Sequence, residues 1–412
     1  MRSRRIALIG AAVLVCGLTS GLVAQNGGVA RASRVSAIPG ERTYTGGSLS
    51  AERLQRIGQL IDRRVAANDI AGAVTLVAQR GQIVHFEARG LMDIDSHKPM
   101  ARDTLFDVAS MTKPITAVAI LMLVEEGRLR LTDPVSQFIP SFRNLNVKPA
   151  ADAQAVPAAR EITVRDLLTH TSGIVSEVKL PRDPTESLAH FIPTFATMPL
   201  EFQPGTRWKY SNTVGFDTLA RIVEVVSGQN FDRFLRERIF TPLGMKDTGH
   251  KVDEARTARL ATLYEPAAPG LRRLQLPDGV AYGAPAYFGG GWGVKTTAQD
   301  YLRFAQMLLN GGELDGKRLL APRTVELMSS VHIPDTLPGR QPGEGWGLGV
   351  RVITDLGARN TWLSNGSYGW NGAFGTRFWI DPTKDLVAIL MVQTPAMGLG
   401  ADFETAVMQA VN

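Results

Sequence analysis

The stretch Phe106-Asp107-Val108-Ala109-Ser110-Met111-Thr112-Lys113-Pro114 guides the interpretation of the whole chain. Ser110 and Lys113 form an S-x-x-K pattern, whose spacing places both side chains on one face of a helix, one turn apart. Because Pro114 is tolerated only in the first turn, Ser110 is predicted to stand where a helix over residues 115–126 begins. There its N–H is free to donate to an oxyanion, and the helix dipole favours the developing negative charge.

The S-x-x-K spacing by itself is weak evidence, because the pattern occurs again at Ser176-Glu177-Val178-Lys179. Ser176 has no comparable helix after it. The run AVAILMLV at 117–124 predicts a buried helix behind Ser110, so Lys113 should be desolvated and able to accept or relay a proton. The alternative is a helix-capping serine with a solvated lysine nearby.

A second motif, Tyr210-Ser211-Asn212, is the only Y-x-N of the chain and directly precedes a predicted helix over 213–227. This loop-to-helix position can direct the phenol and the amide into a cleft. Tyr210 is therefore the candidate general base, since a strongly hydrogen-bonded tyrosine beside a lysine ammonium can take the serine proton. The alternative is a packing tyrosine whose hydroxyl is bonded to the backbone.

A third motif, Trp370-Asn371-Gly372, precedes a strand predicted over 373–380. Gly372 would allow a substrate to approach the strand edge closely, and the N–H of Ala373 could be a second oxyanion donor. The remaining substrate-binding candidates are Trp370, Gly372 and Ala373, together with Asn212. The alternative is that the glycines only accommodate a bend at a sheet edge.

In this order, the three motifs resemble those of the serine β-lactamase and penicillin-binding protein superfamily. The likeness is strongest to its class C-like branch, which includes family VIII carboxylesterases. Residues 162–173 and the segment Gly289-Gly290-Gly291-Trp292 look like other familiar segments of that branch, and the resemblance extends over roughly 50–412. It implies a β-lactamase/transpeptidase-like fold. It also implies that Ser110 is acylated, that Lys113 and Tyr210 shuttle the proton, that Asn212 positions the acyl group, and that the amides of Ser110 and Ala373 hold the oxyanion.

One departure from the family pattern affects the expected substrate. Class C β-lactamases and many carboxypeptidases have Lys-Thr-Gly at the third motif, where the lysine helps to bind the substrate carboxylate, whereas this chain has Trp370-Asn371-Gly372. We therefore expect a serine hydrolase acting on small esters. The first alternative is a β-lactamase or a D-amino-acid-specific peptidase or carboxypeptidase, in which Arg377 replaces the missing lysine. The second is a slow-acylating penicillin-binding module.

His170, with Asp166 one turn before it, invites comparison with a Ser-His-Asp triad. No G-x-S-x-G elbow accompanies them, and the segment 167–173 is typical of a helix end followed by a turn. His170 is accordingly interpreted as a structural residue.

The pattern of apolar residues predicts an α+β fold. A helix over 54–65 precedes a hairpin of 71–78 and 83–88, and strands are predicted over 347–353, 373–380 and 386–392 before a C-terminal helix over 403–411. The simplest assembly is an antiparallel sheet built from both chain ends and flanked by helices. We assign 50–109 plus 286–412 to this α/β domain and 110–285 to an inserted, mostly helical domain.

The N-terminus combines Arg2, Arg4 and Arg5 with an apolar run, which predicts a signal peptide over 1–24, cleaved after Ala24 or as late as Ala32, followed by a flexible leader over 25–49. A periplasmic or secreted enzyme is expected, with membrane contact only through an uncleaved signal segment. The alternative is a transmembrane anchor.

Composition narrows the classes of ligand. The chain has 44% hydrophobic and 20% charged residues, as in ordinary globular proteins, and its net charge of +6 includes the arginines of the signal peptide. No basic run with interleaved aromatics indicates nucleic-acid binding, and no histidine or cysteine cluster indicates a metal. We expect a small-molecule ester or amide substrate and no cofactor, while the oligomeric state is not indicated.

Overall fold

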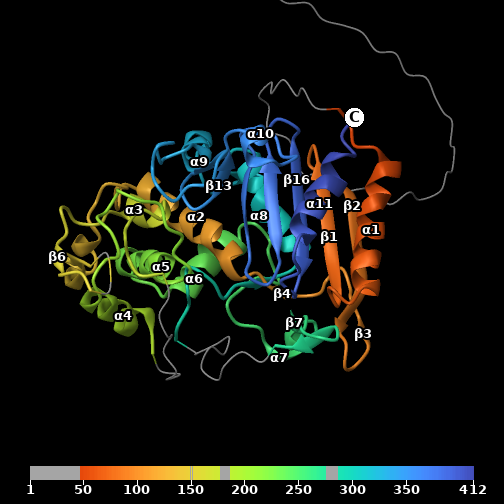
Figure 1. Ribbon diagram of the computed structural model, residues 1–412, viewed down its shortest axis with the longest axis horizontal. Coiled ribbons are helices and arrows are strands. Elements are labelled where there is room, and N and C mark those ends of the chain that lie inside the picture. The colour runs from red at the N-terminus through yellow and green to blue at the C-terminus, as the bar shows by residue number, and fades with distance from the viewer. Residues whose placement is uncertain (1–46, 149, 151, 177–185, 275–285) are drawn as a thin grey trace, which may run out of the picture. The chain divides into compact units, whose positions relative to one another are not determined.

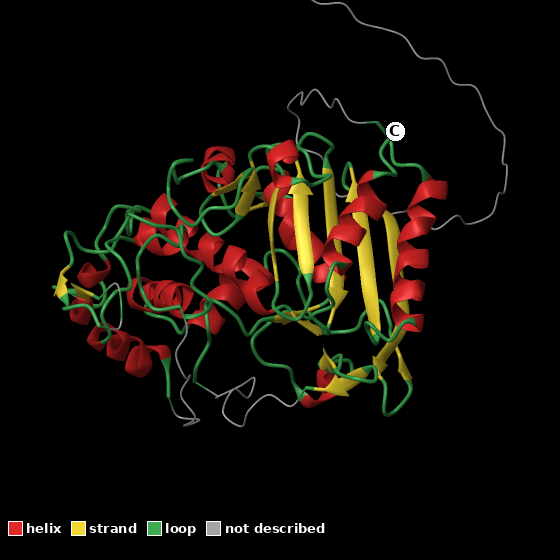
Figure 2. Ribbon diagram, viewed as in Figure 1, coloured by secondary structure: helices red, strands yellow, loops and turns green. Residues whose placement is uncertain are grey.

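The centre of the fold is an antiparallel sheet to which both ends of the chain contribute (Figures 1 and 2). The computed structural model describes residues 47–148, 150, 152–176, 186–274 and 286–412, and within them the sheet has eight strands in the order β12-β13-β14-β15-β16-β1-β2-β3. Its strands are β1 (Gly72–Gln79), β2 (Gln82–Asp93), β3 (Lys98–Pro99), β12 (Glu344–Trp346), β13 (Arg351–Ile353), β14 (Tyr368–Asn371), β15 (Arg377–Asp381) and β16 (Leu386–Val392). The predicted antiparallel sheet from both chain ends is confirmed.

Helices cover both faces of the sheet. Helices α1 (Ala51–Ala66) and α11 (Leu399–Met408) pack together on one face, and α8 (Ala298–Leu309) packs on the other (Figure 2). The strand period of two separates the faces: in β15, Phe378 meets Tyr301 of α8 at 4.9 Å between ring centroids, whereas Trp379 meets Phe403 of α11 at 5.4 Å. Each face therefore has a hydrophobic core of its own.

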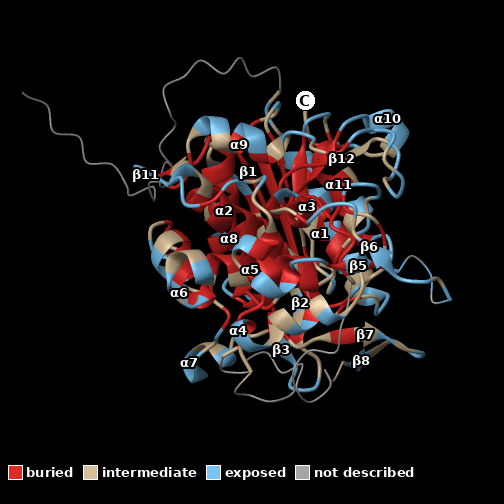
Figure 3. Ribbon diagram, turned by 90° about the vertical axis from the view of Figure 1, so that its left-hand side faces the viewer, coloured by how far each residue is buried: buried red, intermediate tan, exposed pale blue. Residues whose placement is uncertain are grey.

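Helix α2 (Thr112–Glu125) is enclosed on all sides, with every residue from Thr112 to Leu123 buried. It packs against α5 (Val214–Ser227), and Figure 3 shows it among the buried elements. A helix that is apolar all round is stable only inside a protein, and this burial explains the run of aliphatic residues after Pro114. The sequence-based prediction of a buried helix behind Ser110 is confirmed.

The other elements surround α2 and the sheet. The short strand pairs are β4 (Phe106–Asp107) with β9 (Lys295–Thr296), β5 (Asn146–Val147) with β6 (Val156–Pro157), β7 (Tyr264–Pro266) with β8 (Leu271–Arg273), and β10 (Glu313–Leu314) with β11 (Lys317–Arg318). The helices are η1 (Ala109–Met111), η2 (Val135–Gln137), η3 (Pro140–Phe142), α3 (Val164–Leu168), α4 (Leu188–Phe191), η4 (Ile192–Thr197), α6 (Phe231–Leu235), η5 (Arg236–Phe240), α7 (Glu254–Thr257), α9 (Pro322–Ser329) and α10 (Leu356–Arg359).

The described residues belong to a single compact unit, so the boundary between an α/β domain and a helical insertion stays a prediction. The signal peptide predicted over 1–24 lies outside the described residues, as does most of the leader. The last leader residues are described, and Leu49 forms a β-bridge with Val411 beside the C-terminus. No helix in the described part of the chain is long and apolar enough to span a membrane.

Two strand predictions were wrong in their bounds. The strand predicted over 347–353 begins only at Arg351, because residues 347–350 turn between β12 and β13. In this turn Gly349 has a φ of +79° and lies so close to α2 that a Cβ would be 2.6 Å from that of Ala117. The strand predicted over 373–380 begins only at Arg377, because residues 372–376 turn between β14 and β15. A run of apolar residues does not reveal where a glycine reverses the chain.

Candidate active site

Ser110 lies in η1, the 3-10 turn that leads directly into α2, as its position before Pro114 predicted. The residue before it, Ala109, has a φ of +42°, an unfavourable conformation for a residue with a Cβ. The Asp107 carboxylate accepts the N–H of Ala109 at 2.8 Å, and β4 pairs Asp107 with Lys295. The Ser110 side chain thus lies on a turn whose preceding residue, Ala109, is held in a strained conformation by Asp107.

Lys113 is completely buried, and its ammonium connects three segments of the chain. Its Nζ donates to the carbonyl oxygen of Asn212 at 2.6 Å, to that of Gly291 at 2.9 Å and to Ser110 Oγ at 3.1 Å. The same atom lies 4.9 Å from the centre of the Tyr210 ring. The structure therefore brings the predicted Ser110, Lys113 and Tyr210 together.

The surroundings of Lys113 suit both of its protonation states. A charged ammonium has three N–H donors, one for each oxygen, whereas a neutral amine has two donors and one lone pair. With two N–H groups held by carbonyls that can only accept, the lone pair of the neutral amine faces Ser110 Oγ. Lys113 can consequently exchange a proton with Ser110 without rearranging its neighbours.

A buried aspartate that sequence reasoning missed, Asp217 of α5, holds the glycine segment that binds Lys113. Its carboxylate accepts the N–H of Gly291 at 2.9 Å and the hydroxyl of Tyr287 at 2.7 Å, and burial raises the pKa of Asp217. Gly290 packs so closely on α5 that a Cβ would lie 2.2 Å from the carbonyl oxygen of Phe216. An acidic residue within the mostly apolar α5 was the signal that could have revealed this role.

Tyr210 is held by the third motif. The Trp370 indole N–H donates to Tyr210 Oη at 3.0 Å, and the rings of Trp370 and Trp346 pack edge to face with centroids 4.5 Å apart. Ser176, the serine of the second S-x-x-K pattern, donates through Oγ to the carbonyl of Tyr210 at 3.0 Å and accepts the N–H of Asn212 at 3.2 Å. Ser176 is thus a positioning residue for the second motif.

His170 is a buried structural residue. Its Nδ1 accepts the N–H of Ser211 at 3.0 Å, and its ring lies 4.7 Å from that of Tyr210. Burial, and then the charge of Lys113, lower the pKa of His170 well below its ordinary value, so the ring is neutral. Asp166 bonds instead to Arg160 and to Thr163, and this arrangement excludes the triad.

Of the other residues predicted from the sequence, two lie beside the Ser110 turn or Lys113, one lies in a turn and one lies on the far side of the sheet. Asn212 contributes its carbonyl to Lys113, while Gly372 approaches the nucleophile turn so closely that a Cβ would lie 2.5 Å from the Val108 carbonyl oxygen. Ala373 lies in the turn before β15 and not in a strand, so its part in an oxyanion hole stays a prediction. Arg377 lies on the face of the sheet that α11 covers, where it pairs with Glu404 of that helix.

Lys295, which sequence reasoning also missed, lies beneath the nucleophile turn. Its Nζ donates to the carbonyls of Gly293 at 3.0 Å and His250 at 3.2 Å, and it lies 3.9 Å from an oxygen of Asp107. Burial lowers the pKa of Lys295 to about 8, although the Asp107 carboxylate opposes this shift. Lys295 therefore lies beside the Asp107 carboxylate, which accepts the N–H of Ala109.

A serine on a strained turn, a buried lysine within reach of it and a hydrogen-bonded tyrosine define a serine hydrolase that transfers acyl groups. The described residues include no group of three or more His, Cys, Asp or Glu side chains that could hold a metal ion.

Comparisons with known proteins agree with this class. The beta-lactamase family model matches residues 57–411. Protein Rv1367c of Mycobacterium tuberculosis is 34% identical over 79% of this chain and 86% of its own length, and Esterase EstB of Burkholderia gladioli is 31% identical over 88% and 96%. The solved structure of EstCE1, a hydrolase with promiscuous acyltransferase activity, superposes with a TM-score of 0.75 at 26% identity, covering 87% of this chain and 99% of its own.

The chain belongs to the beta-lactamase family. The family resemblance and the β-lactamase/transpeptidase-like fold expected from the sequence are thereby confirmed, and so is the expected serine hydrolase.

The pKa of Lys295 makes a prediction for stability. Between about pH 8 and its ordinary pKa of 10.5, the unfolded chain holds a proton on Lys295 that the folded protein has lost. Raising the pH from about 8 to 10 should therefore increase the free energy of unfolding of wild type relative to Lys295→Met, by about 1–3 kcal/mol. Urea denaturation at both pH values measures the difference. Lys317→Met, at an exposed lysine of β11, is the control and should show no such change; equal pH dependence in Lys295→Met and wild type would contradict the assignment.

Proposed function

We propose that this enzyme hydrolyses small carboxylic esters through a covalent acyl-enzyme on Ser110. The observation that carries the proposal is the contact between Lys113 Nζ and Ser110 Oγ at 3.1 Å, in a site where two backbone carbonyls hold the same nitrogen. Esterase EstB, which is similar over most of both chains, adds support for ester substrates.

The reaction follows from these contacts. Ser110 Oγ attacks the ester carbonyl while its proton passes to the neutral amine of Lys113, from which Tyr210 relays it to the leaving alcohol. The tetrahedral oxyanion is held by the N–H of Ser110 and, as predicted from the sequence, that of Ala373. Collapse of this intermediate breaks the bond to the alcohol, which leaves with the returned proton. Water then attacks the acyl-enzyme, and the same groups take and return its proton, releasing the carboxylic acid and free Ser110.

Esters are favoured over β-lactams by the charges around the third motif. The indole of Trp370 stands where the family's Lys-Thr-Gly motif has an ammonium, and it donates a neutral hydrogen bond to Tyr210. Arg377, the alternative partner for a substrate carboxylate, is paired with Glu404 on the other face of the sheet. Neither residue supplies a cation to a carboxylate bound beside Ser110.

Replacing the nucleophile is the first test. In Ser110→Ala, the rate of p-nitrophenyl butyrate hydrolysis should fall by a factor on the order of 10³ or more, and the protein should not gain mass with a fluorophosphonate, because the attacking hydroxyl is removed. Wild type should show little nitrocefin turnover. Ser176→Ala is the matched control and should still be labelled, since Ser176 only positions Tyr210. Ester turnover and labelling that persist in Ser110→Ala would exclude Ser110 as the nucleophile.

The indole donor can be removed without removing the aromatic ring. Trp370→Phe should lower kcat for p-nitrophenyl butyrate by about 3- to 10-fold, which corresponds to the loss of one hydrogen bond to Tyr210. Trp362→Phe, at a tryptophan that is 62% exposed, should leave kcat unchanged. An unchanged kcat in Trp370→Phe would show that its N–H does not assist Tyr210.

We also propose that the enzyme acts in the periplasm or outside the cell, on the basis of the basic and apolar segment over 1–24. N-terminal sequencing of protein recovered outside the cytoplasm should begin after Ala24 or as late as after Ala32. Recovery of the chain only in the cytoplasm with its original N-terminus would contradict export.

A further inference from the structure

The glycine segment Gly289–Gly291 carries the carbonyl oxygen that accepts from Lys113 Nζ at 2.9 Å. Glycine loses more conformational freedom on folding than any other residue, and this segment has no side chains that could anchor it. Its backbone groups must therefore be held by other parts of the chain. Without such contacts, the carbonyl would not stay in place for Lys113.

Buried side chains from three parts of the chain hold this segment. Asp217 of α5 accepts the N–H of the last glycine, and Thr116 of α2 donates through Oγ1 to the carbonyl of Gly290 at 2.6 Å. The carbonyl oxygen of Gly289 lies 2.9 Å from Nε2 of His250. Because a carbonyl oxygen can only accept, Nε2 carries a proton and donates. His250 is thus the side chain that holds the first glycine.

The backbone of His250 is itself fixed beside β9. Gly249 forms a β-bridge with Lys295, whose Nζ also donates to the His250 carbonyl at 3.2 Å. Gly293 leaves room for the ring, since a Cβ there would lie 3.3 Å from His250 Cδ2. These contacts place the buried imidazole directly against the glycine segment.

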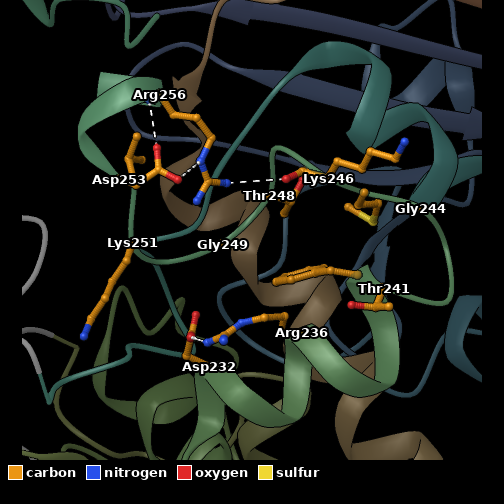
Figure 4. Close-up of a pocket in the computed structure, with 13 residues that line it drawn as sticks. Asp232, Arg236, Thr241, Gly244, Lys246, Thr248, Gly249, Lys251, Asp253 and Arg256 are labelled. Carbon is orange, nitrogen blue, oxygen red and sulfur yellow. Dashed lines mark hydrogen bonds and ion pairs between the residues drawn. The ribbon is translucent and has the colours of Figure 1, made fainter. Parts of the chain in front are cut away.

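Asp232 of α6 determines how the imidazole is turned. Its Oδ1 lies 3.3 Å from both Nδ1 and the backbone nitrogen of His250. Its other oxygen pairs with Arg236, and Figure 4 shows this ion pair below the segment that carries Gly249 and Lys251, the two neighbours of His250. Burial would raise the pKa of Asp232, but His250 and then Arg236 hold it well below its ordinary value. A carboxylate beside Nδ1 directs the opposite ring nitrogen, Nε2, at Gly289.

We propose that His250 is a positioning residue for acyl transfer at Ser110. Its Nε2–H holds the glycine segment, which in turn keeps a carbonyl on Lys113. The inference rests on the proposed role of Ser110 as the nucleophile.

This role affects the chemical step more than substrate binding. If Gly289 were released, the Gly291 carbonyl would no longer be fixed, and Lys113 would lose one of the two acceptors that direct its nitrogen at Ser110 Oγ. Proton exchange would slow, while the groups that contact the substrate would be unchanged. A loss of kcat with little change in KM is therefore expected when the Nε2 donor is removed.

Two substitutions separate the two ring nitrogens. In His250→Gln the amide nitrogen is as many bonds from Cβ as Nε2 and still donates to Gly289, whereas in His250→Asn it replaces Nδ1 and reaches only Asp232. For p-nitrophenyl butyrate, kcat should stay within about threefold of wild type in His250→Gln and fall at least about tenfold in His250→Asn, with KM within about twofold in both. The rate at which a fluorophosphonate labels Ser110 should fall in parallel, because it depends on the same proton transfer.

The control is His97→Asn, the same substitution at an exposed histidine between β2 and β3, which should leave both rates unchanged. All rates are expressed per serine that is labelled at completion, so that unfolded protein is not counted. Equal losses of kcat in His250→Gln and His250→Asn, or a larger loss in His250→Gln, would overturn the proposal, because the ring or its pairing with Asp232 would then be what matters. Wild-type labelling and kcat in His250→Asn would also overturn it. Failure of wild type to be labelled at Ser110 would instead contradict the nucleophile.

Thr116→Val tests the same segment if His250→Asn does not fold. It is nearly isosteric and removes the hydroxyl that holds the Gly290 carbonyl, so kcat and the labelling rate should both fall by about 3- to 10-fold. Wild-type rates in Thr116→Val would show that the position of the glycine segment does not control the reaction, and would overturn the proposal as well.

Discussion

The burial of the Lys113 ammonium is the constraint on which the rest of the site depends. An ion removed from water is tolerated only where its hydrogen bonds are replaced, since an unpaired buried charge is very costly. The protein supplies a hydroxyl from η1, a carbonyl from the segment before α5 and a carbonyl from the glycine segment before β9. Three stretches far apart in the sequence must therefore converge on one atom.

This convergence explains why glycines and a buried acid surround α2. Gly290 permits the glycine segment to lie directly on α5, and Gly349 permits the β12–β13 turn to lie directly on α2. Asp217 then accepts the N–H of Gly291, whose carbonyl binds Lys113, so a carboxylate and an ammonium act on two ends of the same residue. The buried positive charge is stabilised without a direct ion pair, and Lys113 keeps its contact with Ser110.

The parts of this site that follow local rules could be predicted from the sequence. The helix start at Ser110 follows from Pro114 and the apolar run, whereas the proximity of Tyr210 was implied by the family resemblance. The partners of Asp217 and Lys295 could not be predicted, because most of them are backbone groups or side chains distant in the sequence. The position of Ala373 was misjudged because it depends on a turn, whereas the alternation of apolar residues gives only the direction of side chains once a strand exists.

The third motif shows why the same framework can favour neutral substrates. An ammonium at position 370 would place a second cation beside Tyr210, near Lys113, and a bound carboxylate would compensate that charge. The indole of Trp370 makes the hydrogen bond to Tyr210 without adding charge, and His170, whose ring also lies beside that of Tyr210, is neutral. Lys113 is then the cation that contacts the Tyr210 ring. Because these neighbours require no anionic group on the substrate, a neutral ester is compatible with this arrangement.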